Sequence, residues 1–396
     1  MTPHTPAQKD VVLSGTVSAG GGQSPGDLSL IRPMDAVMIL YSTADPELTE
    51  TIVASLSHGV FEGVHGGPAS RGQRAFARFS YRVLKLTTSR RKSKGEEYEG
   101  GAFHNPIMVW SGHPYARALL DSSRKETENL VEGGDPMNGP YMMISREILK
   151  GSDVWDRVFL HSVQGKDVQL RFIAETRATY EAARRRLEKG EHVRLKAVAA
   201  GTGLSMILAY DRLMKEGRDP DRITVRITDR DQANVEKMGR LLAKLASTRS
   251  RFTKSQTEVA GSISIGTEDL FEGEPGSDTT GEAKYHVVTA IGILDYLQGF
   301  TCGTTEQAQG LPHPEECVKA EHLVARLSHM TQPGGDLIVN SYRPDPSTRI
   351  LELFGRKFRY RTQDNLTALL ATANFSNPRL VESGNVYDVV VYEKNV

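Results

Sequence analysis

The chain has 396 residues, 38% hydrophobic and 25% charged, a composition typical of globular proteins and a length that suits two domains. Its 49 basic and 49 acidic residues cancel, so charge favours neither nucleic acid nor an anionic membrane as a partner. Only two cysteines occur, without metal-type spacing, and no apolar stretch could span a bilayer, so we expect a cytoplasmic protein with no metal site.

Composition divides the first half of the chain into two parts. Residues 1–33 are rich in Gly, Ser, Thr and Pro, which predicts a disordered tail. Residues 34–190 predict a mainly helical domain that serves as a lid or a substrate domain. Within it we expect helices at 45–56, 114–120, 145–150 and 167–187 and surface loops at 90–105 and 131–140.

Strands and helices alternate through the remaining residues, 191–396. Strands are predicted at 193–199, 222–228, 263–265, 286–293, 336–340, 379–383 and 386–393. Helices are predicted at 204–215, 232–245, 321–330 and 363–373. This alternation indicates an α/β domain with a Rossmann-like, doubly wound parallel sheet. The two final strands have no helix between them, which predicts an antiparallel edge strand.

The first chemical feature is Gly201-Thr202-Gly203, which follows a strand and Ala199 and precedes a helix. Such a turn lets a ligand approach the backbone closely at the start of a helix. The third glycine of the dinucleotide fingerprint would stand at Met206, so the sequence argues against a pyrophosphate cofactor. A nucleoside cofactor without phosphate fits better.

Polar residues also follow the next three strands. Asp229, beside Arg230, can accept the two hydroxyl groups of a ribose, although Asp229 or Asp231 can instead cap the next helix. Glu268 and Asp269 can bind an adenine amino group or simply form a polar loop. Beyond the fourth strand we expect three residues to face the crevice of the sheet: Gly292, Asp295 and Tyr296.

Together with the segment Gln332-Pro333-Gly334-Gly335, these features resemble class I S-adenosylmethionine-dependent methyltransferases. The resemblance covers residues 196–394. It is closest to a bacterial branch with a "GLFDYL" segment, similar to AIGILDYL here, which includes enzymes that make fatty-acid methyl ester signals. The resemblance implies S-adenosylmethionine as cofactor, bound by the residues after each strand: Ala199, Gly201, Thr202, Gly203, Asp229, Arg230, Glu268, Asp269 and Gly292.

One position departs from the family pattern. The acid that usually precedes the glycines is replaced by Ala197. The ammonium group of the cofactor's methionine end must therefore bind elsewhere, for example to a backbone carbonyl or to a side chain from the N-terminal part.

The resemblance implies methyl transfer to a small molecule in bacterial secondary metabolism or signalling. A homodimer is one assembly that we consider. The alternative is an S-adenosylmethionine cyclase like the azetidine-2-carboxylate synthases, whose neutral amine would suit the missing acid. A lesser alternative is a non-catalytic cofactor-binding scaffold. The predicted catalytic residues are Tyr296, Asp295 and Tyr180. The tyrosines considered for a cation–π contact with the sulfonium are Tyr115, Tyr141, Tyr180, Tyr296 and Tyr342.

Overall fold

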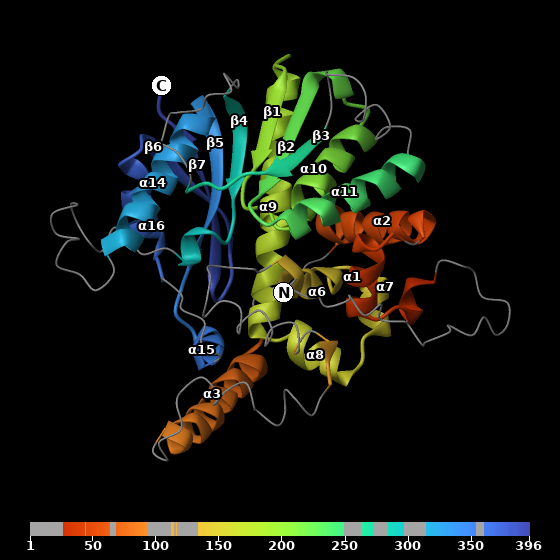
Figure 1. The fold of residues 1–396 in the computed structure, drawn as a ribbon, viewed down its shortest axis with the longest axis vertical. Coiled ribbons are helices and arrows are strands. Elements are labelled where there is room, and N and C mark those ends of the chain that lie inside the picture. The colour runs from red at the N-terminus through yellow and green to blue at the C-terminus, as the bar shows by residue number, and fades with distance from the viewer. Residues whose placement is uncertain are drawn as a thin grey trace, which may run out of the picture.

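A seven-stranded sheet forms the centre of the computed structural model, with the strand order β3-β2-β1-β4-β5-β7-β6 (Figure 1). The structure describes residues 27–43, 45–63, 69–92, 112–114, 116, 134–248, 263–271, 284–296, 314–353 and 360–396. The strands are β1 (Val193–Ala197), β2 (Ile223–Asp229), β3 (Ile263–Thr267), β4 (Tyr285–Ala290), β5 (Thr331–Tyr342), β6 (Phe375–Ser383) and β7 (Tyr387–Lys394).

Strands β1 to β5 run parallel, and β7 pairs antiparallel with both β5 and β6. The Rossmann-like α/β fold with an antiparallel edge is therefore confirmed. The segment at 332–335, which precedes the strand predicted at 336–340, lies inside β5. Tyr285 of β4 pairs with Thr331 of β5, whereas Val287, two residues later, pairs with Asp336. The residues of β5 between Thr331 and Asp336 therefore form a bulge. Gly334, with φ of 68°, provides the left-handed residue of this bulge.

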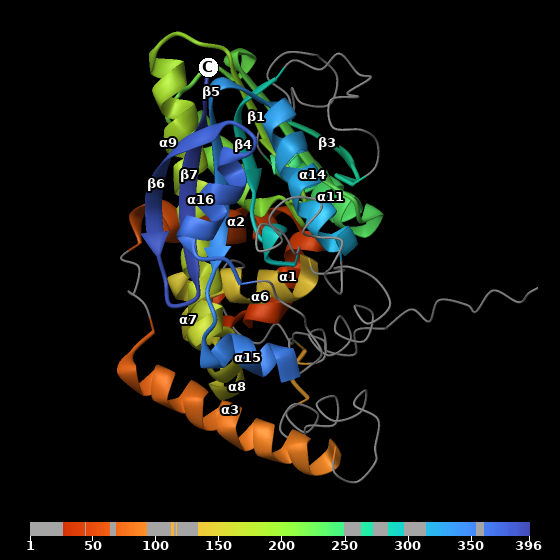
Figure 2. The ribbon, with the colours of Figure 1, turned by 90° about the vertical axis from the view of Figure 1, so that its left-hand side faces the viewer.

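Helices cover both faces of the sheet, because its strands are apolar on both sides. Along β7, Val389 and Val391 join one core cluster and Val390 and Tyr392 join the other, as the alternation of a strand requires. The first cluster packs against α9 (Val163–Glu188), α10 (Leu204–Lys215) and α11 (Gln232–Thr248). The second packs against α14 (Pro314–Met330) and α16 (Gln363–Ala371), and Figure 2 shows α9 and α14 on opposite sides of the sheet.

The N-terminal helices gather beyond the carboxyl ends of the parallel strands (Figure 1). They are η1 (Leu28–Leu30), α1 (Pro33–Tyr41), α2 (Pro46–Glu62), α3 (Arg71–Lys92), α6 (Gly134–Met142), α7 (Arg146–Gly151) and α8 (Val154–Leu160). Asp45 caps α2 by accepting the N–H of Leu48, and Ser145 caps α7 through the N–H of Ile148. The remaining short elements are η3 (Pro220–Arg222), η5 (Leu294–Tyr296) and α15 (Pro346–Leu353), which contacts α3.

Two sequence predictions for this half are wrong in part. Leu28, inside the expected disordered tail, is buried in the main core, while residues 1–26 lie outside the described residues. The expected loop at 131–140 contains most of α6, where Pro136 occupies the first turn and Asn138 is buried. The predicted elements at 90–105 and 114–120 fall largely outside the described residues, and α3 was not expected.

The N-terminal helices and the sheet share one hydrophobic core. That cluster includes Leu40 of α1, Leu56 of α2, Met142 of α6 and Phe172 of α9 together with Val225 of β2. No helix in the described ranges is both long and apolar enough to cross a membrane. The proposed division between a domain at 34–190 and one at 191–396 stays a prediction, although the two parts pack against each other.

Candidate functional site

A cavity lies where β1 to β4 end, which is the edge at which open α/β sheets bind ligands. Its floor is made by the segments that follow these strands, and its opposite wall comes from α6, α9 and the start of β7. The floor residues are Val198 to Thr202, Leu204, Ser205, Asp229, Arg230, Asn234, Glu268 to Phe271, Thr289 and Ile291 to Ile293; the wall residues are Asn138, Tyr141, Arg171, Phe172, Glu175 and Tyr387.

The turn after β1 is held in an unusual backbone conformation. Ala199, Gly201 and Gly203 have φ values of 48°, 57° and 64°, all in the left-handed region. Ala199 and Gly201 line the cavity as predicted, whereas Gly203 does not. A Cβ at Gly203 would lie 2.7 Å from Ile227 Cγ2 and 2.9 Å from Met238 Sδ. Gly203 therefore allows the turn to pack closely against β2 and α11.

Asp229 anchors this turn from the end of β2. Its Oδ2 accepts the backbone N–H of Gly201 at 2.7 Å. Its Oδ1 accepts the backbone N–H of Asp231 at 2.9 Å and a side-chain N–H of Asn234 at 3.3 Å. Burial raises the pKa of the Asp229 carboxyl, and the hydrogen bonds oppose that shift. Three of the four lone-pair sites of the carboxylate are therefore taken, and Oδ2 keeps one with which it can accept a ribose hydroxyl group.

Thr202 lines the cavity, and its hydroxyl forms hydrogen bonds with the N-terminal helices. Its hydroxyl donates to Asn138 Oδ1 of α6 at 2.9 Å and accepts from the Tyr41 hydroxyl of α1 at 2.8 Å. All three side chains are buried. The network fixes α1 and α6 to the glycine turn, so these helices help to set the shape of the floor.

The two acids after β3 have different surroundings. Glu268 forms an ion pair with Lys196 Nζ at 2.9 Å and lies 3.8 Å from Arg326. Asp269 accepts the N–H of Phe271 at 2.9 Å, and the described residues provide it with no ion pair. Both line the cavity, as does Arg230. Asp269 is thus the better candidate for an adenine amino group, since the carboxylate of Glu268 already faces a cation.

Gly292 and Asp295 are joined through Asn340. The Asn340 Oδ1 accepts the Gly292 N–H at 2.7 Å, and its Nδ2 donates to both oxygens of Asp295 at 3.0 Å. Gly292 lines the cavity, whereas Asp295 is not among the lining residues. Tyr296 ends η5, and its side chain lies outside the described residues.

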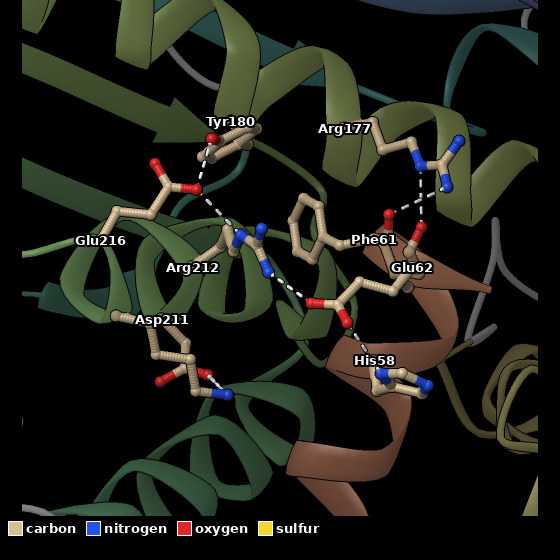
Figure 3. Close-up of polar contacts among 10 residues, drawn as sticks. His58, Phe61, Glu62, Arg177, Tyr180, Asp211, Arg212 and Glu216 are labelled. Carbon is tan, nitrogen blue, oxygen red and sulfur yellow. Dashed lines mark hydrogen bonds and ion pairs between the residues drawn. The ribbon is translucent and has the colours of Figure 1, made fainter.

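Tyr180, predicted as a catalytic residue, is not among the residues that line the cavity. Figure 3 shows it in a polar cluster that joins α2, α9 and α10. The hydroxyl of Tyr180 donates to Glu216 Oε1 at 2.6 Å, and Arg212 bridges Glu216 to Glu62 with two contacts of 2.9 Å. The ring of Tyr180 packs against Phe61 edge to face. This cluster stabilises the helix packing.

Of the other tyrosines considered, Tyr141 lines the cavity and stacks on Phe172 with ring centroids 4.1 Å apart. Tyr342 is fully buried outside it and stacks on Tyr387, a lining residue that was not predicted. Tyr115 lies outside the described residues. Ala197 is buried in β1 and does not reach the cavity.

The prediction missed Arg171 and Glu175, two charged side chains that α9 places in the cavity wall. Each is more than nine-tenths buried, with exposed fractions of 7% and 8%. Their spacing of four residues puts them on one face of the helix. A charged pair on the apolar side of a predicted helix was the available signal, since such residues are seldom buried without a purpose.

No family model matches the sequence, and a search of the curated proteins finds no match. Among solved structures, the CurJ carbon methyltransferase is 12% identical with a TM-score of 0.42, over 92% of this chain and 100% of that one. Magnesium protoporphyrin IX methyltransferase from Synechocystis, solved with bound SAH, is 11% identical with a TM-score of 0.36, over 58% and 87%. Human N-acetylserotonin methyltransferase in complex with SAM is 13% identical with a TM-score of 0.35, over 74% and 70%.

Proposed function

We propose that the chain is an S-adenosylmethionine-dependent methyltransferase that acts on a small molecule. The observation that carries the proposal is the carboxylate of Asp229, fixed on the Gly201 N–H at the floor of a cavity that extends along the ends of β3, β2, β1 and β4. A carboxylate in this place binds ribose hydroxyl groups in nucleotide-binding α/β folds.

The same carboxylate argues against a phosphate-bearing cofactor. A pyrophosphate would need the free N–H groups at the glycine turn and the start of α10. Here Asp229 occupies the Gly201 N–H and brings a negative charge to the turn. The residues therefore fit an uncharged nucleoside at this position, which S-adenosylmethionine contains.

The strand order then orients the nucleoside. With the ribose at β2, the adenine would lie toward β3, where Asp269 offers an acceptor and Leu270 and Phe271 offer apolar surface. The methionine end would lie over β1 and β4. When bound, S-adenosylmethionine supplies an activated methyl group, and the chain contributes binding, alignment and exclusion of water.

The wall formed by α6 and α9 supports a small acceptor rather than a macromolecule. Side chains from both helices face the strand ends across the cavity, among them Tyr141 and Phe172. An acceptor must fit between this wall and the floor. We propose a small molecule of bacterial secondary metabolism or signalling as the substrate class.

The deciding experiment incubates the purified protein with S-adenosylmethionine, alone and with panels of small-molecule hydroxyl, amine and carboxyl acceptors. Methyl transfer predicts adenosylhomocysteine that forms only when an acceptor is present. Methylthioadenosine formed without an acceptor would overturn the proposal in favour of a cyclase. Absence of calorimetric binding of both S-adenosylmethionine and adenosylhomocysteine would overturn the cofactor assignment itself.

A further inference from the structure

Helix α9 brings an opposite pair of charges, Arg171 and Glu175, into the cavity one helical turn apart. Among the described residues, these two side chains form no ion pair with each other within 4.0 Å. Burying an unpaired charge costs roughly several kcal/mol of folding free energy per ion. A buried cation and a buried anion that face the same cavity without pairing require an explanation in terms of what enters it.

Arg171 is held in place but keeps binding capacity. Its guanidinium lies over the ring of Tyr387 with Cζ 4.5 Å from the centroid, and the Tyr141 side chain lies close enough to interact with its charge. Its nearest carboxylate is that of Asp295, at 4.0 Å. The Nε atom is buried and has no hydrogen-bond partner among the described residues. Such a fork suits a carboxylate ligand.

The hydrogen-bond donor to Glu175 is a neutral side chain. The Oε1 of Glu175 accepts a hydrogen bond from the hydroxyl of Ser205 at 2.8 Å, and the side chain of Thr289 lies nearby. Among the ion pairs that the described part of the chain forms, none involves Glu175. Hydroxyl groups orient the carboxylate and leave its charge for a cation in the cavity.

The position of Arg171 and Glu175 indicates which charged groups of the ligand they would face. Ser205 lies in the first turn of α10, after the glycine turn, Thr289 lies at the end of β4, and Gly292 follows that strand. Arg171 Nη1 lies 3.4 Å from the place that a Gly292 Cβ would take. The pair thus faces the β1–β4 side of the cavity, two strands away from Asp269. This is the side to which the proposed cofactor directs its methionine end.

We propose that Arg171 and Glu175 bind the α-carboxylate and the α-ammonium of the methionine end of S-adenosylmethionine. This inference rests on the proposed function. It gives the ammonium an acceptor on the helix that precedes β1, in place of the acid that Ala197 lacks. A zwitterion is the ligand whose two charges match a buried cation and a buried anion on one helix face.

The test measures binding rather than turnover, by calorimetry with three ligands. Adenosylhomocysteine carries both charges, its analogue without the α-amine carries only the carboxylate, and methylthioadenosine carries neither. For Glu175→Gln we expect adenosylhomocysteine to bind at least tenfold more weakly, with the other two ligands unchanged within about twofold. For Arg171→Lys we expect losses for the first two ligands and none for methylthioadenosine.

The control is Glu181→Gln, the same change at an exposed site of the same helix, which should leave all three affinities unchanged. Retained binding of methylthioadenosine shows that a variant is folded. If Glu175→Gln binds adenosylhomocysteine as tightly as the wild type, the inference is overturned and the proposed function stands. If wild type binds none of the three ligands, the proposed function fails first.

Discussion

The Asp229 carboxylate accepts the backbone N–H of Gly201 at 2.7 Å, which joins the end of β2 to the turn that follows β1. The two neighbouring strands thereby form one rigid floor. The carboxylate is only 8% exposed, so what remains of its surface faces the cavity.

Replacing Asp229 with Ala should therefore weaken every adenosine ligand. We expect adenosylhomocysteine and methylthioadenosine to lose similar affinity, roughly 10- to 100-fold, which corresponds to about 1.5–3 kcal/mol for hydrogen bonds to a charged group. Calorimetry with both ligands measures the loss. Because Ala also frees the N–H groups of Gly201 and Asp231, the midpoint of thermal unfolding should fall as well.

The matched control is Asp231→Asn, which removes a carboxylate two residues further on. Asp231 Oδ1 accepts the N–H of Ala233 at 2.9 Å, and an Asn side chain can do the same. This variant should bind both ligands normally. Undiminished binding by Asp229→Ala would remove Asp229 from the ribose role.

Gly203→Ala should destabilise the fold rather than block the cofactor. The added methyl would meet Ile227 and Met238 at less than 3.0 Å in a backbone conformation that disfavours it. We expect a loss of about 2–4 kcal/mol in the free energy of unfolding, from strain and overpacking together. Chemical denaturation measures this loss.

Gly217→Ala provides the comparison, because Gly217 also has positive φ, of 73°, but no atom within 4 Å of a new Cβ. That variant should lose only about 1 kcal/mol. Equal losses at the two glycines would show that packing against Ile227 and Met238 contributes nothing at Gly203.

The strands and the floor of the site follow from local sequence, whereas the wall does not. The alternation of β7 and the glycines after β1 are visible within a few residues, so the sheet and the places of Gly201 and Asp229 could be predicted. Gly203 could not be separated from Gly201, because its neighbours Ile227 and Met238 are distant in the chain. Arg171 and Glu175 lie on a long helix, and the direction that their face takes depends on how α9 packs on the sheet.

Tyr180→Phe tests the predicted catalytic role of this residue. The change removes the hydrogen bond to Glu216 in the α2–α9–α10 cluster, so stability should fall by about 1 kcal/mol. Ligand affinity and methyl transfer should be unchanged, because Tyr180 does not reach the cavity. Tyr141→Phe is the counterpart inside the cavity: it removes a hydroxyl that interacts with the charge of Arg171, so it should weaken the binding of adenosylhomocysteine and spare that of methylthioadenosine. A Tyr180 variant of normal stability that no longer turns over would restore its catalytic role.

Glu175 should also make the protein less stable at neutral than at acidic pH. Burial raises the pKa of its carboxyl from 4.5 to about 6, with the hydroxyl of Ser205 and the charge of Arg171 opposing the shift. A raised pKa contributes stability that is complete below 4.5 and is lost as the pH rises through about 6. Glu175→Gln should thus gain about 2 kcal/mol relative to wild type at pH 7 and almost nothing at pH 4. Urea unfolding at pH 7 and pH 4 measures the difference in stability. An equal gain at the two pH values would show that titration of Glu175 does not cause it.

Ligand binding should follow the opposite trend with pH, since the ammonium needs the ionised carboxylate. The groups that face Glu175 are Arg171 on the same helix, Tyr141 on α6, and the hydroxyls of Ser205 and Thr289. Arg171 and Tyr141 keep their charge states between pH 5 and 7, so Glu175 sets the dependence. Wild-type affinity for adenosylhomocysteine should fall roughly tenfold from pH 7 to 5, while that for methylthioadenosine stays constant.

The same titration in Glu175→Gln separates this carboxylate from Asp295, whose pKa burial also raises to about 6. Asp295 lies 4.0 Å from Arg171 and is not among the residues that line the cavity, so it would act on the ligand indirectly. If the variant shows no dependence between pH 5 and 7, Glu175 is the titrating group. If the full tenfold change persists in the variant, the pH dependence belongs to Asp295, and the ammonium does not bind at Glu175.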